Sequence, residues 1–213
     1  MKNRITGFYS ISVLALVLNG CLRSDLPIQF YLLSADVVPA GKEVKPLAAA
    51  SEETVIGLGP VHIPEYLNRP QMVLGVAENQ YRLDEDHRWA ERLDQNISRA
   101  LLQSLSAQLG QVQVVRHPWS PRQSIDYQTS IEILELHRDA AGQSRMSAQW
   151  TVKSRERTLT AERFDCRLPV PKDDFEALVK AQSECLARLS SDIAGALGQL
   201  ITENGGSGEN RGR

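Results

Sequence analysis

The spacing of apolar residues predicts two long amphipathic helices. Apolar side chains recur every three or four positions from Ala90 to Leu109 and again from Phe175 to about Thr202, which is the spacing of a helix with one buried face. Gly110 follows the first helix at the position where glycine commonly ends one. Asp173 or Asp174 is placed to cap the start of the second helix. Each helix is expected to pack one face against a sheet.

Shorter apolar runs predict the strands of that sheet. In residues 145–153 apolar and polar side chains alternate, which is typical of an antiparallel strand with one face in water. The mainly apolar run 28–33, which includes Gln29, instead predicts a buried strand. The run 54–63 contains Gly57, Gly59 and Pro60, which indicate a bulge or a sheet edge. The other expected strands are 71–76, 80–83, 112–115, 127–136 and 158–166.

These elements predict a single α+β domain over residues 28–202. Two long helices would pack on a mixed, largely antiparallel sheet. Residues 35–53 read as a loop because they contain prolines, a glycine and a run of alanines. Residues 203–213 are rich in glycine and polar residues, so we expect a disordered tail.

The first twenty residues have the pattern of an export signal. Lys2 and Arg4 precede an apolar run at residues 11–18, which is too short to cross a bilayer, since spanning needs about 20 apolar residues. We therefore predict a signal peptide over residues 1–20. The run ends in Leu18-Asn19-Gly20-Cys21, which resembles the bacterial lipobox. That resemblance implies cleavage between Gly20 and Cys21 and acylation of Cys21. The alternative is an ordinary signal peptide with an incidental cysteine.

The segment after the cysteine is a short lipidated linker, residues 21–27. Six extended residues span roughly 20 Å, so the folded domain would lie close to the lipid surface. Leu22 stands where an aspartate commonly retains enterobacterial lipoproteins in the inner membrane. We therefore expect anchoring at the periplasmic face of the outer membrane rather than in the inner membrane.

Composition narrows the classes of partner. The chain has 42% hydrophobic and 23% charged residues, as in a globular protein rather than a disordered or multi-span one. It has 24 basic and 26 acidic residues, and loss of Lys2 and Arg4 would leave 22 against 26, a formal charge of −4. A nucleic-acid-binding protein usually carries a basic surplus. We therefore expect no nucleic-acid partner.

The remaining candidate chemistry is sparse. His87 lies near Glu91, but no nucleophile accompanies the pair, so we predict a structural role at the helix entry or in a subunit contact. Trp89 is expected in the core or an interface. The histidines are scattered singly and there is no Cys-x-x-Cys, which predicts neither a metal site nor a cofactor. Glycine-rich phosphate loops and a Gly-x-Ser-x-Gly elbow are absent, so we expect no enzyme.

Two further features have two interpretations each. Cys166 and Cys185 remain as an even pair once Cys21 is acylated, and they are either a disulfide between a strand and the last helix or two buried thiols. Tyr66 and Leu67 lie between two prolines. They form either an exposed apolar knob suited to a partner or a turn folded back onto the core.

Several motifs resemble one family, the ABC-type transport auxiliary lipoproteins, or PqiC-like lipoproteins. The more specific are Pro-x-Tyr-Leu-x-Arg-Pro at residues 64–70 and His-Arg-Trp-Ala-Glu at 87–91. Weaker matches are the strand motif at 30–33 and the helix opening at 175–181. Arg92 departs from the family, which often has proline there, and this would lengthen the helix at its N-terminus.

The resemblance implies a non-catalytic accessory subunit of an MCE-type intermembrane lipid transport system. Its implied partners are an MCE-domain protein (PqiB-like), that protein's membrane transport partners and the outer-membrane lipid surface, with a homo-oligomeric ring receiving the transport tunnel. The candidate partner contacts are Tyr66, Leu67, Arg69, His87 and Trp89. The alternatives are a periplasmic carrier of lipid or another small ligand, and a periplasmic enzyme built around His87.

Overall fold

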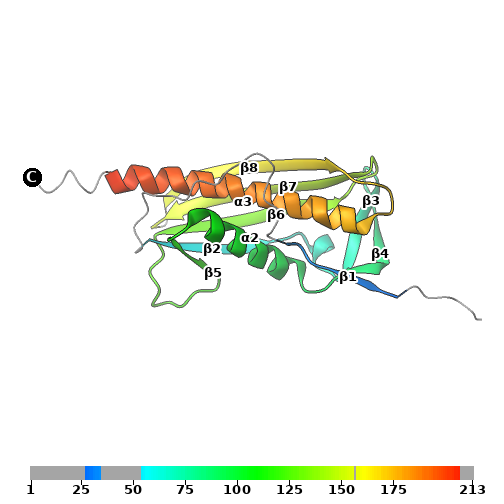
Figure 1. Cartoon of the computed structure of the whole chain (residues 1–213), viewed down its shortest axis with the longest axis horizontal. Helices are drawn as coiled ribbons and strands as arrows, with labels where there is room; N and C mark the ends of the chain where they lie inside the picture. Colours follow the sequence, from blue (N-terminus) through cyan, green and yellow to red (C-terminus); the bar gives the residue numbers. More distant parts are fainter. Residues whose placement is uncertain (1–26, 35–53, 156, 207–213) are drawn as a thin grey trace, which may run out of the picture.

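A mixed sheet of eight strands carries two long helices on one face (Figure 1). This computed structural model describes residues 27–34, 54–155 and 157–206. The arrangement confirms the predicted α+β class. No helix in the described ranges is long and apolar enough to cross a membrane. The predicted signal peptide, the lipobox with Gly20 and Cys21, and the loop 35–53 lie outside the described residues.

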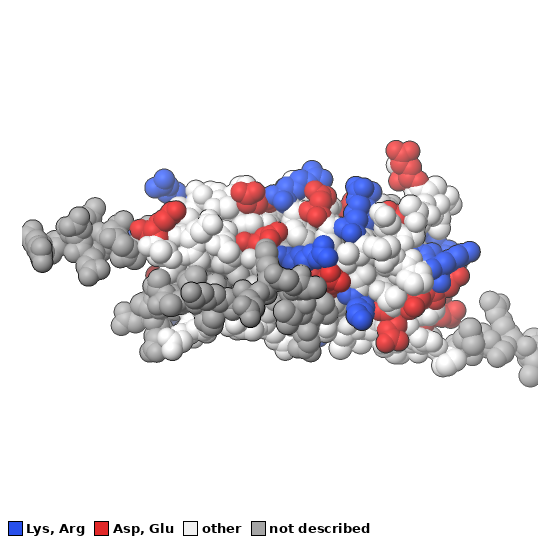
Figure 2. Space-filling model, turned by 45° about the horizontal axis from the view of Figure 1, so that its top comes forward, with Lys and Arg blue, Asp and Glu red and all other residues white. Residues whose placement is uncertain are grey.

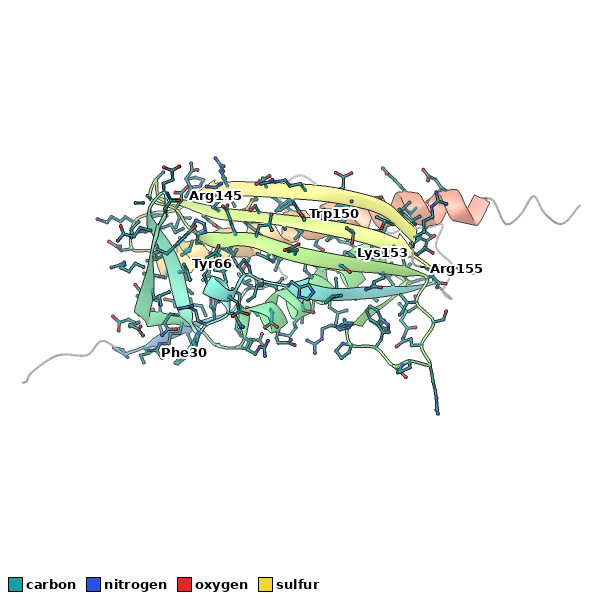
Figure 3. All side chains as sticks on the ribbon, turned by 180° about the vertical axis from the view of Figure 1, so that it is seen from behind. Phe30, Tyr66, Arg145, Trp150, Lys153 and Arg155 are labelled. Atoms are coloured by element: carbon teal, nitrogen blue, oxygen red, sulfur yellow. A yellow bond between two sulfur atoms is a disulfide. The ribbon has the colours of Figure 1, made fainter. Side chains whose placement is uncertain are left out.

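The longest strands form an antiparallel meander. They are β6 (Tyr127–Arg138), β7 (Gln143–Ser154) and β8 (Arg157–Pro169). In β7 the apolar positions face the helices and are buried: Met146, Ala148, Trp150 and Val152. The other face of the meander carries polar side chains toward the viewer in Figure 3, which labels Lys153 at one end of β7 and Arg145 at the other. The predicted one-sided strand is therefore confirmed.

Beside the meander, the pairing becomes parallel. Strand β2 (Val55–His62) lies between β6 and β5 (Gln113–Arg116) and runs parallel to both. Its register shifts between Leu58 and Val61, so the glycines mark a bulge and not an edge. Gly59 has a φ of 115°, a conformation that other residues rarely adopt. Parallel pairing requires a crossover connection, which helix α2 supplies between β2 and β5.

The helix boundaries differ from the prediction at two places. Helix α2 (Leu93–Leu109) starts at Leu93 because β4 occupies the chain as far as Trp89, and Arg92 is its extended N-cap. The start at Ala90 and the lengthening attributed to Arg92 are therefore wrong. Helix α3 (Phe175–Gly206) is capped by Asp174, whose Oδ1 accepts a hydrogen bond from the Ala177 amide at 2.8 Å.

Helix α3 continues beyond the expected end at Thr202. Residues 203–206 are helical, so the prediction of a disordered tail from residue 203 is wrong for them, and residues 207–213 lie outside the described residues. The helix runs along the long axis of the molecule, so that β1 and the C-terminal end of α3 lie at opposite ends (Figure 1).

The β1 end of the molecule is a small sub-sheet set across the end of the meander. Strands β3 (Gln71–Ala77) and β4 (Gln80–Trp89) form the predicted hairpin, and β1 (Gln29–Tyr31) pairs in parallel with the last residues of β4. Strand β4 extends well past the predicted end at Leu83 because β1 supplies it with a second neighbour. The buried strand predicted at 28–33 is instead a sheet edge, and Phe30 is 64% exposed.

A disulfide joins the meander to the long helix inside the core. Cys166 on β8 and Cys185 on α3 are both buried, and their Cα atoms are 5.7 Å apart. The bond closes a segment that contains the whole β8–α3 turn, with a sequence separation of 19 residues. It therefore fixes how α3 lies against the sheet.

Candidate partner-binding site

A pocket of about 300 Å³ opens where the turn before β3 meets the junction of β4 and α2. Its shape depends on the main chain, because the Trp89 amide donates a hydrogen bond of 2.7 Å to the carbonyl of Pro70. The lining residues are Asn68, Arg69, Pro70, Trp89, Ala90, Glu91, Arg92 and Leu93. Both specific sequence motifs, 64–70 and 87–91, thus contribute to one concavity.

The charged side chains at this pocket differ in whether they form ion pairs. Arg92 forms a two-pronged ion pair with Asp94, at 3.1 and 2.8 Å, and Glu91 pairs with Arg99. Burial alone would raise the pKa of Asp94, but hydrogen bonds from Arg92 and Gln95 outweigh it and the pKa is lowered. Among the residues the structure describes, Arg69 is exposed and has no ion pair. It is the pocket's available cation.

Leu67 and Trp89 present little surface of their own in this chain. Their exposed fractions are 2% and 6%, because both pack into the core beneath the pocket. Because Trp89 still lines the pocket, the partner contacts at these two positions stay a prediction. They support the site from below, and Arg69 is carried on the surface above them.

Tyr66 folds back onto the sheet. Its hydroxyl donates a hydrogen bond of 3.3 Å to the carbonyl of Leu134, and its ring stacks on Tyr81 with centroids 5.3 Å apart. Of the two interpretations of Tyr66 and Leu67, the turn folded onto the core is the one the structure shows, and the exposed knob is wrong. Tyr66 belongs to a short 3-10 helix, η2 (Glu65–Leu67).

Behind Tyr66 lies a polar and aromatic cluster that sequence reasoning missed. Tyr81 meets His137 edge-on at 5.1 Å, and Arg145 pairs with Glu135 at 2.7 Å. Burial raises the pKa of Tyr66 well above its ordinary value and lowers the pKa of His137, so both side chains are neutral at pH 7. The cluster attaches η2 and β4 to the meander, and Figure 3 labels Tyr66 and Arg145 toward the same end of the molecule.

His87 lies outside the pocket and braces β4 against α3. Its ring stacks on Phe175 with centroids 3.6 Å apart, and its Nδ1 is 2.7 Å from Asp84 Oδ1. An imidazole beside a carboxylate resembles part of a catalytic dyad, but here one ring face is covered by Phe175. Within the described ranges, no three His, Cys, Asp or Glu side chains are grouped to hold a metal ion.

The N-terminal segment is joined to both helices by hydrogen bonds, of which those to Asn96 are buried. Asn96 on α2 is 0% exposed; its Oδ1 accepts from the Leu33 amide at 2.7 Å, and its Nδ2 donates to the Leu33 carbonyl at 3.0 Å. The Ser34 amide donates to Ser183 Oγ on α3 at 3.1 Å. Sequence reasoning missed Asn96, although a polar residue between the apolar positions Leu93 and Ile97 is a recognisable signal.

A larger groove of about 580 Å³ runs between the C-terminal half of α3 and strands β7 and β8. It is lined by Trp150, Thr160, Glu162, Arg163, Ser191, Asp192, Gly195, Ala196, Gln199, Leu200 and Glu203. Most of these side chains are polar or charged, which is a poor match to an acyl chain. Over the face shown in Figure 2, acidic and basic side chains are interspersed, so no single sign of charge dominates there.

Comparison with known proteins places this architecture in a defined class. The family model for the ABC-type transport auxiliary lipoprotein component matches residues 31–194, and the chain belongs to that family. The intermembrane transport lipoprotein PqiC of Escherichia coli K12 is 22% identical over 190 residues, which cover 89% of this chain and 97% of PqiC. PqiC of Shigella flexneri gives the same values.

A crystal structure of a Xanthomonas campestris protein has the same fold. Its TM-score is 0.66 at 16% identity, over 84% of this chain and 98% of that one. A second crystal structure, of an uncharacterized protein, also gives 0.66, at 21% identity, over 81% of this chain and 99% of that one. These two likenesses concern the fold. As a member of the family, the chain is a transport auxiliary lipoprotein, associated with a membrane and periplasmic.

Proposed function

We propose that this chain is a non-catalytic accessory subunit of an MCE-type intermembrane lipid transport system, anchored at the periplasmic face of the outer membrane. The observation that carries the proposal is the family match over residues 31–194, together with the nearly full-length likeness to an intermembrane transport lipoprotein. The lipobox ending at Cys21 supplies the anchor, and Leu22 in place of aspartate favours the outer membrane.

The proposed mechanism is geometric. Acyl chains on Cys21 hold the N-terminal segment at the bilayer, and the bonds of Asn96 and Ser183 to residues 33 and 34 pass that restraint to both helices. The domain then presents a fixed surface to an MCE-domain protein resembling PqiB, as one subunit of a homo-oligomeric ring that receives the tunnel. No group in this mechanism performs chemistry on the cargo.

We assign Arg69 and the pocket beside it as part of the protein-contacting surface. Arg69 is exposed, it has no ion pair among the described residues, and the buried Leu67 and Trp89 hold the main chain around it. An exposed cation on a rigid base suits a carboxylate or a main-chain carbonyl of a partner. Tyr66 and His87 are assigned as supports of this surface, because their rings are stacked on Tyr81 and Phe175.

A pull-down from the native bacterium tests the function. The tagged, lipidated chain is extracted in mild detergent, and co-purifying proteins are identified by mass spectrometry. We expect an MCE-domain protein in the eluate of the wild type. Recovery of the chain alone and as a monomer, with a bound lipid, would favour the carrier interpretation instead. The Cys21→Ala variant shows whether anchoring is needed for that contact.

Arg69→Ala tests the assigned surface within the same experiment. We expect it to reduce recovery of the MCE-domain protein while leaving the thermal unfolding temperature unchanged, because Arg69 is exposed. Arg122→Ala, at an exposed arginine of the loop between β5 and β6, is the matched control and should recover the partner at the wild-type level. Equal recovery with both variants would remove Arg69 from the contact.

A further inference from the structure

The large apolar side chains that remain exposed in the described part of the chain all lie at the β1 end. Val76, Tyr81 and Leu83 belong to the β3–β4 hairpin. The other three, which we call the β1 strip, are Ile28, Phe30 and Leu32, with exposed fractions of 44%, 64% and 45%. They occupy alternate positions, so they project from one side of the strand.

The β1 strip is an apolar face without a cover. Tyr31 and Leu33 project from the opposite side of the same strand, where Leu33 is buried in the core and Tyr31 packs against it. Apart from the exposed Gln29, the segment is therefore apolar on both sides, but the core covers only one of them. Natural edge strands are usually protected by charged side chains or proline. An apolar edge of this kind commonly marks a contact surface.

The short linker between Cys21 and Ile28 indicates what covers the strip. The geometry points to the hydrocarbon boundary of a lipid bilayer, into which Ile28, Phe30 and Leu32 insert as a second point of attachment. This inference rests on the proposed function, because it takes Cys21 as acylated. Six residues lie between Cys21 and Ile28, so the seven steps of an extended chain hold the strip within roughly 23 Å of the acyl chains.

The positions of the labelled residues along the molecule agree with attachment at the β1 end. Figure 3 places Phe30 at one end of the molecule and Lys153 and Arg155 at the other. The anchored segment and the exposed apolar side chains therefore lie at the same end, and the β7–β8 turn lies at the far end. A bilayer held by Cys21 meets the β1 end first.

A lipid surface fits the strip better than a second protein does. A stable protein interface buries about 800 Å² on each partner, and three half-exposed side chains supply only a fraction of that. Inserted apolar groups, in contrast, add directly to the binding energy of an acyl anchor. Nearby β4 carries Asp84, Glu85 and Asp86 against Arg82 and Arg88, so attraction to anionic headgroups is not the driving force.

The test uses Phe30→Trp in the full mature, lipidated protein, reconstituted into phosphatidylcholine vesicles. The spectrum of the wild type is subtracted, because the chain contains 3 native tryptophans. Replacing the lipid by its brominated form should quench the emission of Trp at position 30. The matched control is Thr158→Trp, at an exposed position of β8 next to the β7–β8 turn, and it should keep its emission. Quenching should persist in high salt, because phosphatidylcholine vesicles carry no net charge.

The outcomes separate this inference from the proposed function. Unquenched emission from protein that still floats with the vesicles would overturn the strip's insertion and leave the accessory role intact. A blue-shifted but unquenched emission would mean that a protein surface covers the strip, and this too would overturn it. If mass spectrometry of the N-terminal peptide showed no acyl chain on Cys21, the protein would have no lipid anchor, and both proposals would fail. Leu32→Trp provides an independent measurement if Phe30→Trp fails to fold.

Discussion

At the residue scale, Asn96 is the side chain on which the N-terminal segment depends. It lies on the buried face of α2, and it satisfies both main-chain polar groups of Leu33, far away in sequence. A buried amide in such a position is costly unless fully hydrogen-bonded, and here both of its ends are used. The same two bonds therefore fix β1 in place and stabilise α2.

Replacing Asn96 by Ala should lower the free energy of unfolding by about 3 kcal/mol, because the amide and carbonyl of Leu33 are left buried without a partner. Urea unfolding followed by circular dichroism measures the change. Gln103→Ala, at an exposed position of the same helix, is the control and should change stability little. Equal effects of the two substitutions would contradict the role assigned to Asn96.

We expect His137 to make the stability of the fold depend on pH. It is 4% exposed; burial lowers its pKa below the ordinary value of 6.5, Arg145 lowers it further, and Glu135 and Asp139 oppose the shift. The unfolded chain therefore binds a proton more readily than the native chain does. Stability should fall as the pH decreases through about 6.5, with a slope of at most about 1.4 kcal/mol per pH unit from this one group.

The measurement is the free energy of unfolding at a series of pH values between 7 and 5. His137→Gln should flatten the profile in this range, because the group that takes up the proton on unfolding is gone. His117→Gln, at an exposed histidine, is the matched control and should keep the wild-type slope. A profile for His137→Gln as steep as the wild type would mean that other groups dominate.

At the element scale, the disulfide determines how α3 meets the sheet. Replacing both Cys166 and Cys185 by Ala should lower the free energy of unfolding by about 3 kcal/mol, as expected for closing a loop of this length in the unfolded chain. The wild type in the presence of reductant should approach the stability of the double variant. Urea unfolding with and without reductant measures both. A double variant as stable as the oxidised wild type would contradict this contribution.

The helices and strands also show which parts of the fold could be predicted from the sequence and which could not. The helices and the β7 strand were predictable because their periodicity reports one covered face, and α2 ends at Gly110 as expected. The order of the strands was not, because the parallel pairings of β1, β2 and β5 join segments far apart in the sequence. The mainly apolar run 28–33 could not reveal that the core covers only one of its sides.

The candidate site was predictable to a similar extent. The motifs at 64–70 and 87–91 do meet in one pocket, but spacing alone could not separate the buried Leu67 and Trp89 from the exposed Arg69. Their burial depends on η2 folding beneath the hairpin, and the cluster of Tyr66, Tyr81 and His137 holds it there. Contacts of that kind join distant segments, and no local pattern in the sequence reports them.

At the scale of the whole molecule, the short linker matters because it keeps the β1 end near the bilayer. A linker of six residues between Cys21 and Ile28 confines the strip to a small volume above the membrane. The effective concentration of a tethered group falls with about the −3/2 power of linker length. Inserting about 20 Gly and Ser residues after Ser24 should therefore lower it roughly tenfold while leaving the acyl anchor unchanged.

We expect this insertion to reduce the quenching of Trp at position 30 by brominated lipid, although the protein still floats with the vesicles. The same segment appended after Arg213 is the control, because it adds the same residues without lengthening the linker and should leave the quenching unchanged. Undiminished quenching with the longer linker would show that the strip binds lipid strongly enough without the tether. The linker would then set only the reach of the domain, and the β1 strip itself would hold the domain at the membrane.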